Sequence, residues 1–170
     1  SDFERCLDIF KRHNGTADDR IRVALGPHGP DSCTPELLRA VREAADELGC
    51  PINTHMAQSQ AEIDLLEARY GKSPGECFED SGLLGPDLVL AHCIFASDED
   101  LGRIKSHGAT VVNCPRTFSR GGVWAPFERF HGKGLRTLVA TDGYCMDMVT
   151  ELGAAGMISK LHSGRSDAAT

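Results

Sequence analysis

The sequence lacks any long hydrophobic run. Its longest apolar stretches, such as Leu88 to Ala91 and Thr137 to Ala140, are far shorter than the roughly 20 residues that a membrane-spanning helix needs. The chain also opens without the charged and then apolar segment of a secretion signal. We therefore expect a cytoplasmic protein that neither spans a membrane nor has one as a partner.

Basic residues are in the minority. The 170 residues include 18 Lys and Arg against 25 Asp and Glu, which gives a net charge of −7. An acidic surface repels a nucleic-acid backbone, so we expect no nucleic-acid partner. Hydrophobic residues make up 41% of the chain, which is enough for an ordinary packed core. The length predicts a single domain over residues 1–170.

Cysteines are present, but not in the patterns of a structural framework. Their number, seven, is odd, and no C-x-x-C pair occurs. A disulfide framework and a structural zinc cluster therefore both lack support. We expect reduced thiols, most of them buried as small hydrophobic side chains.

What the sequence does contain is a repeated strand-then-helix unit. Helix N-caps are expected at Thr34, at Ser59 in a Ser-Gln-Ala-Glu capping box, and at Ser97. Two further helices are expected over residues 126–131 and 147–161. Short apolar segments, typical of strands covered on both faces, occur at residues 21–26, 51–55, 88–92, 109–113 and 135–141. Repeated five times, this pattern predicts an α/β fold with a parallel sheet.

Polar residues at the strand ends favour one of two parallel architectures. His28, His55, His92 and Asp142 each follow a predicted strand. In a (β/α)8 TIM barrel all these ends meet at one mouth, whereas in an open doubly wound sheet they lie apart. No G-x-G-x-x-G motif or P-loop follows a strand, so nucleotide-type phosphate binding lacks support. We predict a partial barrel of five consecutive βα units, corresponding to strands 4–8.

An incomplete barrel has consequences for assembly. A complete barrel needs eight units and about 250 residues, so either three units, N-terminal to this segment, are missing from it, or a second copy completes the sheet. A five-strand segment leaves open edges with unpaired backbone groups. We therefore predict a homo-oligomer that forms through the open barrel edges.

The strand-end residues have the chemistry of a metal-dependent site. Neutral imidazoles such as those of His55 and His92 bind zinc, and the Asp142 carboxylate could bind metal and accept a proton. Each residue also has an ordinary interpretation: a hydrogen-bonding or core histidine, or an aspartate N-cap. His28 could contact substrate from its Gly/Pro loop, and Trp124 could contact a planar substrate or simply pack against the barrel.

Five short motifs carry a family resemblance. They are Gly26-Pro27-His28-Gly29-Pro30 with Cys33-Thr34-Pro35-Glu36-Leu37, Asn53-Thr54-His55-Met56-Ala57, Leu90-Ala91-His92-Cys93, Val112-Asn113-Cys114-Pro115 and Ala140-Thr141-Asp142-Gly143. In this order and spacing the chain resembles the C-terminal portion of the amidohydrolase superfamily. The branch is that of the triazine hydrolases and aminohydrolases, which includes chlorohydrolases and cytosine-, guanine- and adenosine-type deaminases.

The resemblance implies a role for each strand-end residue. His55 would be a metal ligand, His92 would orient water or substrate and contribute to the metal site, and Asp142 would bind metal and act as the base. His28 would line the substrate pocket. One divalent ion, Zn²⁺ or Fe²⁺, and a small heterocyclic substrate are implied, with hydrolysis of a C–N or C–halide bond.

The chain departs from the family pattern at two points. The His-x-His metal pair of the first strand is not in this chain, so we expect weak or no metal binding by it alone. The family glutamate three residues after the strand-five histidine is replaced by Gln58, and a carboxamide cannot titrate. A substrate that needs no such proton, a substitute acid such as His28, and a lost activity are all compatible with Gln58.

Three hypotheses therefore remain open from the sequence. The first is a metal-dependent hydrolase of nitrogen heterocycles. The second is a catalytically inactive fragment or remnant of such an enzyme. The third is an unrelated, non-enzymatic α/β binding module with incidental histidines.

Overall fold

A four-stranded parallel sheet forms the centre of the molecule. The computed structural model describes residues 2–143 and 146–169. The strands are β1 (Ile52–Met56), β2 (Leu88–His92), β3 (Thr110–Asn113) and β4 (Arg136–Val139). Their order in the sheet is β1-β2-β3-β4, so each strand pairs in parallel with the next one in the sequence. Within these strands the order never reverses, as it would at the switch point of a doubly wound sheet.

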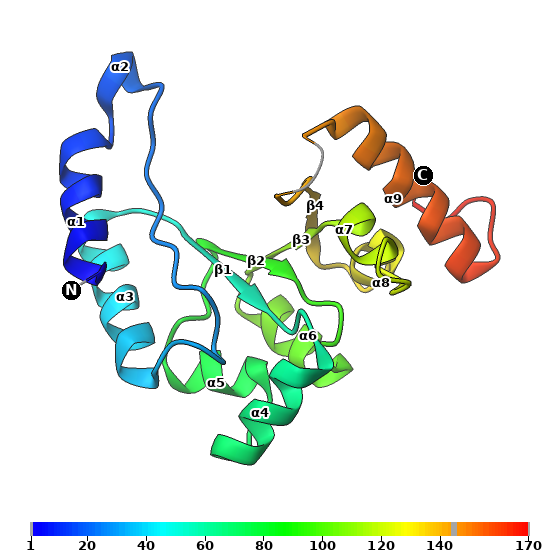
Figure 1. Ribbon diagram of the computed structural model, residues 1–170, viewed down its shortest axis with the longest axis horizontal. Coiled ribbons are helices and arrows are strands. Elements are labelled where there is room, and N and C mark those ends of the chain that lie inside the picture. The colour runs from blue at the N-terminus through cyan, green and yellow to red at the C-terminus, as the bar shows by residue number, and fades with distance from the viewer. Residues whose placement is uncertain (1, 144–145, 170) are drawn as a thin grey trace.

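Helices connect and flank the strands. They are α1 (Asp2–His13), α2 (Thr16–Asp19), α3 (Pro35–Leu48), α4 (Gln60–Tyr70), α5 (Pro74–Asp80), α6 (Asp98–Ser106), α7 (Pro115–Ser119), α8 (Phe127–His131) and α9 (Met148–Ser163). Figure 1 shows α1 and α3 at the β1 end of the sheet and α7, α8 and α9 at the β4 end. The predicted helices are confirmed, whereas α1, α2, α5 and α7 were not predicted. α5 has only seven residues, too few to show a clear apolar period.

Local capping chemistry sets where the predicted helices begin. Thr34, Ser59 and Ser97 each accept a hydrogen bond from the backbone N–H three residues later, as expected for N-caps. One detail of the prediction is wrong. The Glu62 carboxylate does not close a capping box on Ser59 but accepts from the N–H groups of Ala57 and Gln58.

The first predicted strand is the least regular. Of residues 21–26, only Leu25 forms a β-bridge, and its partner is Ile52. Two hydrogen bonds hold it there, from Leu25 N–H to Pro51 and from Asn53 N–H to Leu25. Gly26 and Pro27 follow, and a proline has no N–H to extend a ladder. The described residues therefore confirm four parallel strands and leave the five-unit count unconfirmed.

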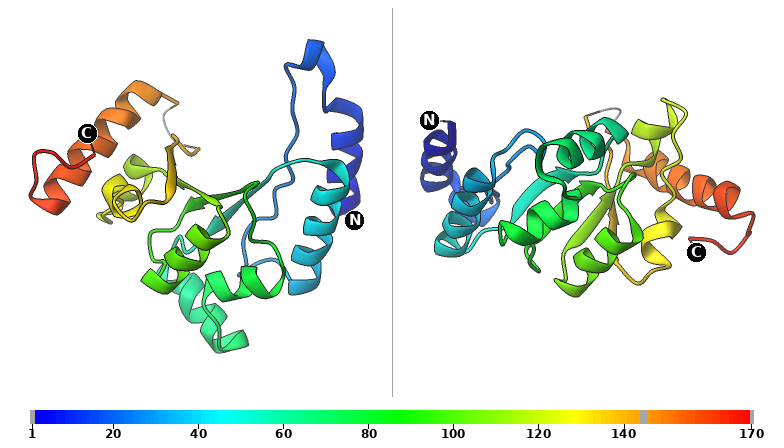
Figure 2. Two further views of the ribbon diagram at one scale, coloured as in Figure 1. Left: turned by 180° about the vertical axis from the view of Figure 1, so that it is seen from behind. Right: turned by 90° about the horizontal axis from the view of Figure 1, so that it is seen from below.

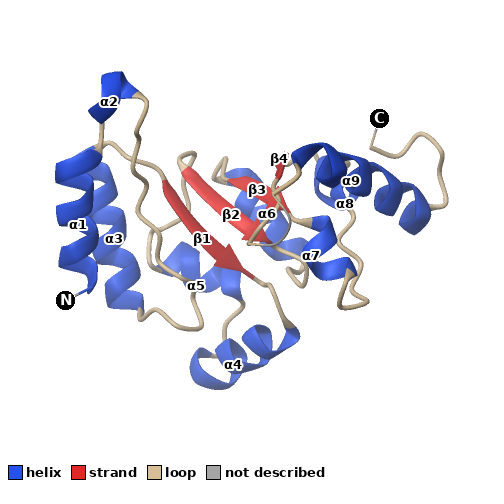
Figure 3. Cartoon of the chain, turned by 45° about the horizontal axis from the view of Figure 1, so that its top comes forward, coloured by secondary structure: helices blue, strands red, loops and turns tan. Residues whose placement is uncertain are grey.

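The two faces of the sheet differ in what covers them. Along β1, residues 52, 54 and 56 are buried while 53 and 55 are less so. The buried side packs into one core with Phe78, Leu101 and Ile104 of the helical layer. Figures 2 and 3 show α5 and α6 on this side of the strands. One face of the sheet is therefore packed against helices, while the cover of the other face stays a prediction.

Two further observations bear on the composition. Among the described residues, no helix is both long and apolar enough to cross a membrane. The six described cysteines are free thiols, four of them buried, as predicted. Cys145 lies outside the described residues.

Candidate active site

A cavity on the open face of the sheet collects the strand-end residues. The register aligns His55 with Ala91, Ala91 with Val112, and Val112 with Leu138, so these side chains form one row across four strands. They line a cavity of about 350 Å³ together with Asn53, His92, Cys114, Val139, Ala140 and Asp142. The structure thus brings together three of the predicted site residues: His55, His92 and Asp142.

His55 has a defined tautomer. Its Nδ1 lies 2.8 Å from the backbone carbonyl oxygen of His28. A carbonyl can only accept, so Nδ1 carries the proton and Nε2 of the neutral ring keeps its lone pair. A second-sphere hydrogen bond of this kind is how metal-binding histidines are usually oriented. His55 is therefore prepared to offer Nε2 to an electrophile in the cavity.

His92 reaches the cavity because the backbone turns there. It follows Ala91, which lines the cavity, so a regular pleat would point it to the other face. Its φ of +79° ends that alternation, and its ring stacks on that of His55, with centroids 5.2 Å apart and an interplanar angle of 1°. On its other side the ring meets Phe118 edge-on.

The surroundings of His92 keep its ring neutral. The residue is 3% exposed, and burial lowers its pKa to about 4, against the opposing charge of Asp142. Its Nδ1 is buried without a hydrogen-bond partner. An orphaned buried nitrogen is unfavourable, and a bound ligand or ion is one way to satisfy it.

Asp142 and Cys114 complete a compact group with His92. One potential ligand atom from each of these residues lies within 4.8 Å of the others. Asp142 has a left-handed backbone, with φ +57°, and one of its oxygens accepts from Gly143 N–H at 2.5 Å. Burial, aided by the carboxylates of Asp142 and Glu151, raises the pKa of the Cys114 thiol to about 12.

Cys114 was not predicted as a site residue. The signal that could have found it is its position, because it directly follows a predicted strand just as His55, His92 and Asp142 do. An imidazole, a thiol and a carboxylate are all ligand types that zinc accepts. The described residues therefore offer a mixed N/S/O donor set at one end of the sheet.

The other predicted site residues lie around or away from this cavity. The His28 ring meets the His55 ring edge-on at 4.8 Å, and its Nδ1 is 2.9 Å from the Ser32 hydroxyl. Gln58 follows β1 and donates its backbone N–H to Glu62. Trp124 is not brought to the cavity. It is 53% exposed and meets the His162 ring of α9 in a separate pocket.

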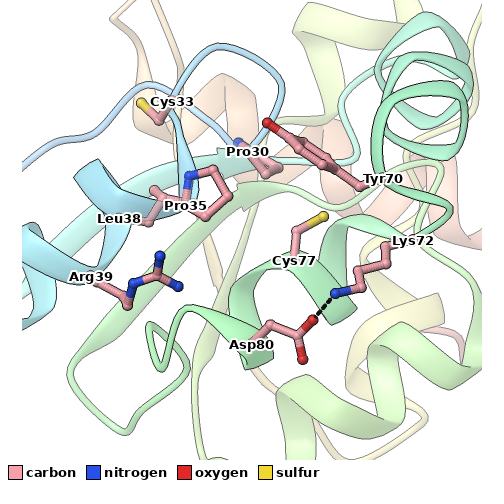
Figure 4. Close-up of a pocket in the computed structure, with 9 residues that line it drawn as sticks. All are labelled: Pro30, Cys33, Pro35, Leu38, Arg39, Tyr70, Lys72, Cys77 and Asp80. Atoms are coloured by element: carbon pink, nitrogen blue, oxygen red, sulfur yellow. Dashed lines mark hydrogen bonds and ion pairs between the residues drawn. The ribbon is translucent and has the colours of Figure 1, made fainter.

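A second pocket lies in the outer helical layer, between α3, α4 and α5 (Figure 4). It has a volume of about 180 Å³. Its cations are already paired, Lys72 with Asp80 and Arg39 with Glu36. Burial raises the pKa of Cys77 in its wall to about 11, so that thiol is protonated at neutral pH. This pocket therefore offers little for chemistry, in contrast to the strand-end cavity.

Known proteins resemble this chain in sequence over most of its length. The chain is 34% identical over 163 residues to a 5-methylthioadenosine/S-adenosylhomocysteine deaminase of Thermococcus onnurineus, covering 92% of this chain and 38% of that protein. It is 34% identical over 168 residues to a 5'-deoxyadenosine deaminase of Methanosarcina barkeri, with coverages of 96% and 39%. The chain thus spans less than half the length of these relatives.

A solved structure shares the fold. An adenosine deaminase from Xanthomonas campestris, crystallised with bound zinc, superposes with a TM-score of 0.90 at 22% identity, covering 99% of this chain and 39% of that one. The sequence profile of the Amidohydrolase family matches residues 3–169 of this chain. The hypothesis of an unrelated α/β module is therefore wrong, and the chain belongs to the Amidohydrolase family.

Proposed function

We propose that this chain forms the C-terminal part of a metal-dependent hydrolase that removes an amino group, or a comparable leaving group, from a nitrogen heterocycle. The observation that carries the proposal is the convergence of His55, His92 and Asp142 on one cavity. These residues come from the ends of three different strands, and only tertiary structure could unite them. The family membership and the names of the deaminase relatives support the same reaction class.

We also propose that the sheet is the second part of a (β/α)8 barrel. The sequential parallel order of β1 to β4 is that of a barrel wall. The Leu25 bridge to Ile52 continues the wall by one irregular strand. On this proposal the open face of the sheet is the barrel interior, and the cavity lies at the C-terminal mouth, where barrel enzymes have their sites.

The residues of the cavity fit a divalent ion such as zinc. The orphaned Nδ1 of His92 and the fixed tautomer of His55 are both features of an incomplete coordination site. His55, His92 and Asp142 would hold the ion, with Cys114 beside them. When bound, the ion supplies Lewis acidity that makes water a nucleophile near neutral pH.

The side chains have separable roles in such a reaction. Asp142 acts as the base and accepts the proton of the attacking water, because its carboxylate lies in the cavity. His92 is neutral at pH 7, so it can orient water or substrate by a hydrogen bond without adding charge. His28, edge-on to His55, borders the substrate side.

Gln58 distinguishes this chain from an ordinary deaminase of the family. Its carboxamide can donate a hydrogen bond to a ring nitrogen but cannot deliver a proton. We therefore propose a substrate that is protonated from another group, with the nucleoside and triazine substrates of related enzymes as the starting classes for assay.

The test uses the complete protein that contains this segment. Ammonia release is measured with 5'-deoxyadenosine, 5-methylthioadenosine and an aminotriazine, after chelation and again after Zn²⁺ is restored. We expect zinc-dependent turnover that falls at least roughly 100-fold in Asp142→Asn and His55→Gln, as for loss of an acid–base or ligand group.

A remote histidine provides the matched control. His107 is partly exposed and faces Glu79 at 3.2 Å, away from the cavity, so His107→Gln should keep full activity. No turnover of any of the three substrates by the zinc-loaded protein would overturn the proposal and favour an inactive remnant.

A further inference from the structure

Two neighbouring turns carry the site histidines and have unfavourable backbone conformations. After β1 the chain turns at Ala57, with φ +50°. At the end of β2 it turns at His92 and Cys93, with φ +79° and +53°. Residues with a Cβ rarely adopt this left-handed region. Such turns persist only where surrounding contacts hold them.

A buried carboxylate holds the first turn. Glu62 of α4 is 3% exposed, and its two oxygens accept from the backbone N–H groups of Ala57 at 2.7 Å and Gln58 at 2.9 Å. Helix capping does not require these two hydrogen bonds, because the Ser59 cap uses the backbone N–H of Glu62 and not its carboxylate. The carboxylate therefore binds the turn and not its own helix terminus.

A guanidinium holds the second turn. Arg129 of α8 donates to the backbone carbonyls of Ile94 at 3.0 Å and Ala96 at 2.6 Å, with a longer contact to Cys93 at 3.4 Å. These three carbonyls all lie within the four residues that follow His92. Hydrogen bonds that involve a charged group are stronger than neutral ones, so Arg129 restrains the segment that sets the direction of His92.

The two turns are also bonded to each other. Cys93 N–H donates to the Met56 carbonyl, and Phe95 N–H donates to the Ala57 carbonyl, both at 2.9 Å. Ala57 therefore donates to Glu62 and accepts from Phe95. A continuous chain of hydrogen bonds runs from Glu62 through both turns to Arg129.

We infer that Glu62 and Arg129 are positioning residues that act as a pair, fixing the relative placement of His55 and His92 through the two linked turns. One side chain satisfies the N–H groups of the first turn, and the other satisfies the carbonyls of the second. Neither lines the cavity. The inference rests on the proposed function only for the reason why His55 and His92 are placed in this way. Its test requires neither a bound metal nor enzymatic turnover.

The test measures amide hydrogen exchange by NMR on the present chain. Glu62→Gln keeps the shape of the side chain but leaves one N–H facing an NH₂ group. If the turns are coupled, protection falls at Cys93 and Phe95, whose N–H groups donate to Met56 and Ala57 and not to Glu62. We expect a decrease of roughly 10- to 100-fold, as for a lost hydrogen bond to a charged group. Arg129→Met should lower protection reciprocally at Ala57 and Gln58.

Two matched variants separate positioning from general destabilisation. Asp100→Asn changes another buried carboxylate, which accepts from the Ser73 hydroxyl at 2.5 Å. Arg136→Met removes another guanidinium that donates to loop carbonyls, those of Pro86 and Gly108 at the opposite strand ends. In both variants, the protection of the amides in the two turns should stay unchanged relative to that of the amides in the rest of the sheet.

A second readout follows the histidines themselves. Ring ¹⁵N shifts report the tautomer and surroundings of His55 and His92, and both sets should move in Glu62→Gln and in Arg129→Met. Arg129→Lys, which keeps the charge but not the two-pronged geometry, should recover part of the effect. The pairing is refuted if Glu62→Gln and Arg129→Met each disturb only the turn that the changed residue touches. It is also refuted if Asp100→Asn and Arg136→Met lower the protection of both turns as much as these two variants do.

Discussion

The Arg42–Asp87 pair makes a quantitative prediction about how the helical layer is attached to the sheet. Arg42 of α3 donates both terminal nitrogens to the two Asp87 oxygens, at 2.9 and 2.7 Å. Asp87 immediately precedes β2, and its carbonyl accepts from Ile52 N–H of β1 at 3.1 Å. The pair therefore links α3 to the beginning of two strands.

The expected effect lies between two limits. Fully exposed ion pairs contribute about 0.2–1 kcal/mol, whereas breaking a buried pair costs about 3–5 kcal/mol. The Arg42 side chain is 14% exposed and that of Asp87 is 37% exposed, so solvent screens the carboxylate in part. We expect Arg42→Met to lower the free energy of unfolding by about 2 kcal/mol, given the two-pronged geometry.

The dependence on pH has a definite sign. The Arg42 guanidinium holds the pKa of Asp87 below its ordinary value. For a carboxyl whose pKa is lowered on folding, the stabilisation is present above the unfolded-state pKa, about 3.9, and is lost as pH falls through the lower folded-state pKa. The destabilisation by Arg42→Met should therefore be full at pH 7. It should shrink as the pH falls below the pKa of the Asp87 carboxyl in the unfolded chain.

The assay is urea unfolding of a double-mutant cycle, with Arg42→Met, Asp87→Asn and both changes together. Arg39→Met is the control, because Arg39 makes a single 3.1 Å contact to Glu36 with side chains 49% and 75% exposed. Solvent screens such an exposed pair, so its loss should destabilise the fold far less than loss of the Arg42–Asp87 pair. A coupling energy between Arg42 and Asp87 no larger than the loss of stability in Arg39→Met, or one unchanged on acidification, would refute the reasoning.

Four further predictions concern composition, chemistry, packing and assembly. Elemental analysis of the purified chain should find well below one zinc per chain, because the family's His-x-His pair is absent from it; stoichiometric zinc would contradict this. In the complete protein, Gln58→Glu should change the rate or range of aminopyrimidine or triazine hydrolysis, and an unchanged profile would remove Gln58 from the mechanism. Phe78 is fully buried, so Phe78→Ala should lower the unfolding free energy by about 3–5 kcal/mol, whereas Ile9→Ala, at a 44% exposed site, should cost far less in the same urea titration. Light scattering should show concentration-dependent self-association, since β4 ends the described sheet and its outer edge has no partner strand among the described residues; a monomer at all concentrations would count against open-edge assembly.

Local features were the ones that the sequence by itself determined. Thr34, Ser59 and Ser97 begin helices because a short polar side chain can satisfy an N–H three residues on, whatever the rest of the fold does. The strand end at His92 was also predictable, because an apolar run stops there. The end predicted at His55 lies one residue before the end of β1. The convergence of these ends followed from parallel connections, which bring all C-terminal ends to one edge.

Other features were decided by the tertiary structure alone. Glu62 binds Ala57 and Gln58 instead of capping its own helix, because a buried carboxylate bonds to whichever donors the turn brings near. His92 enters the cavity through a left-handed backbone that no periodicity encodes.

Cys114 and Trp124 show two further features that the sequence did not determine: one joins the site without having been predicted, and the other was predicted and lies elsewhere. Cys114 joins His92 and Asp142, although a lone strand-end cysteine carries no spacing signal, while Trp124 contacts α9 in a separate pocket. The sequence therefore determined which groups occupy the ends of the strands, since that depends on neighbours along the chain. Their orientation, and the contacts that hold it, depended on groups distant in the sequence, and so only the folded chain decided them.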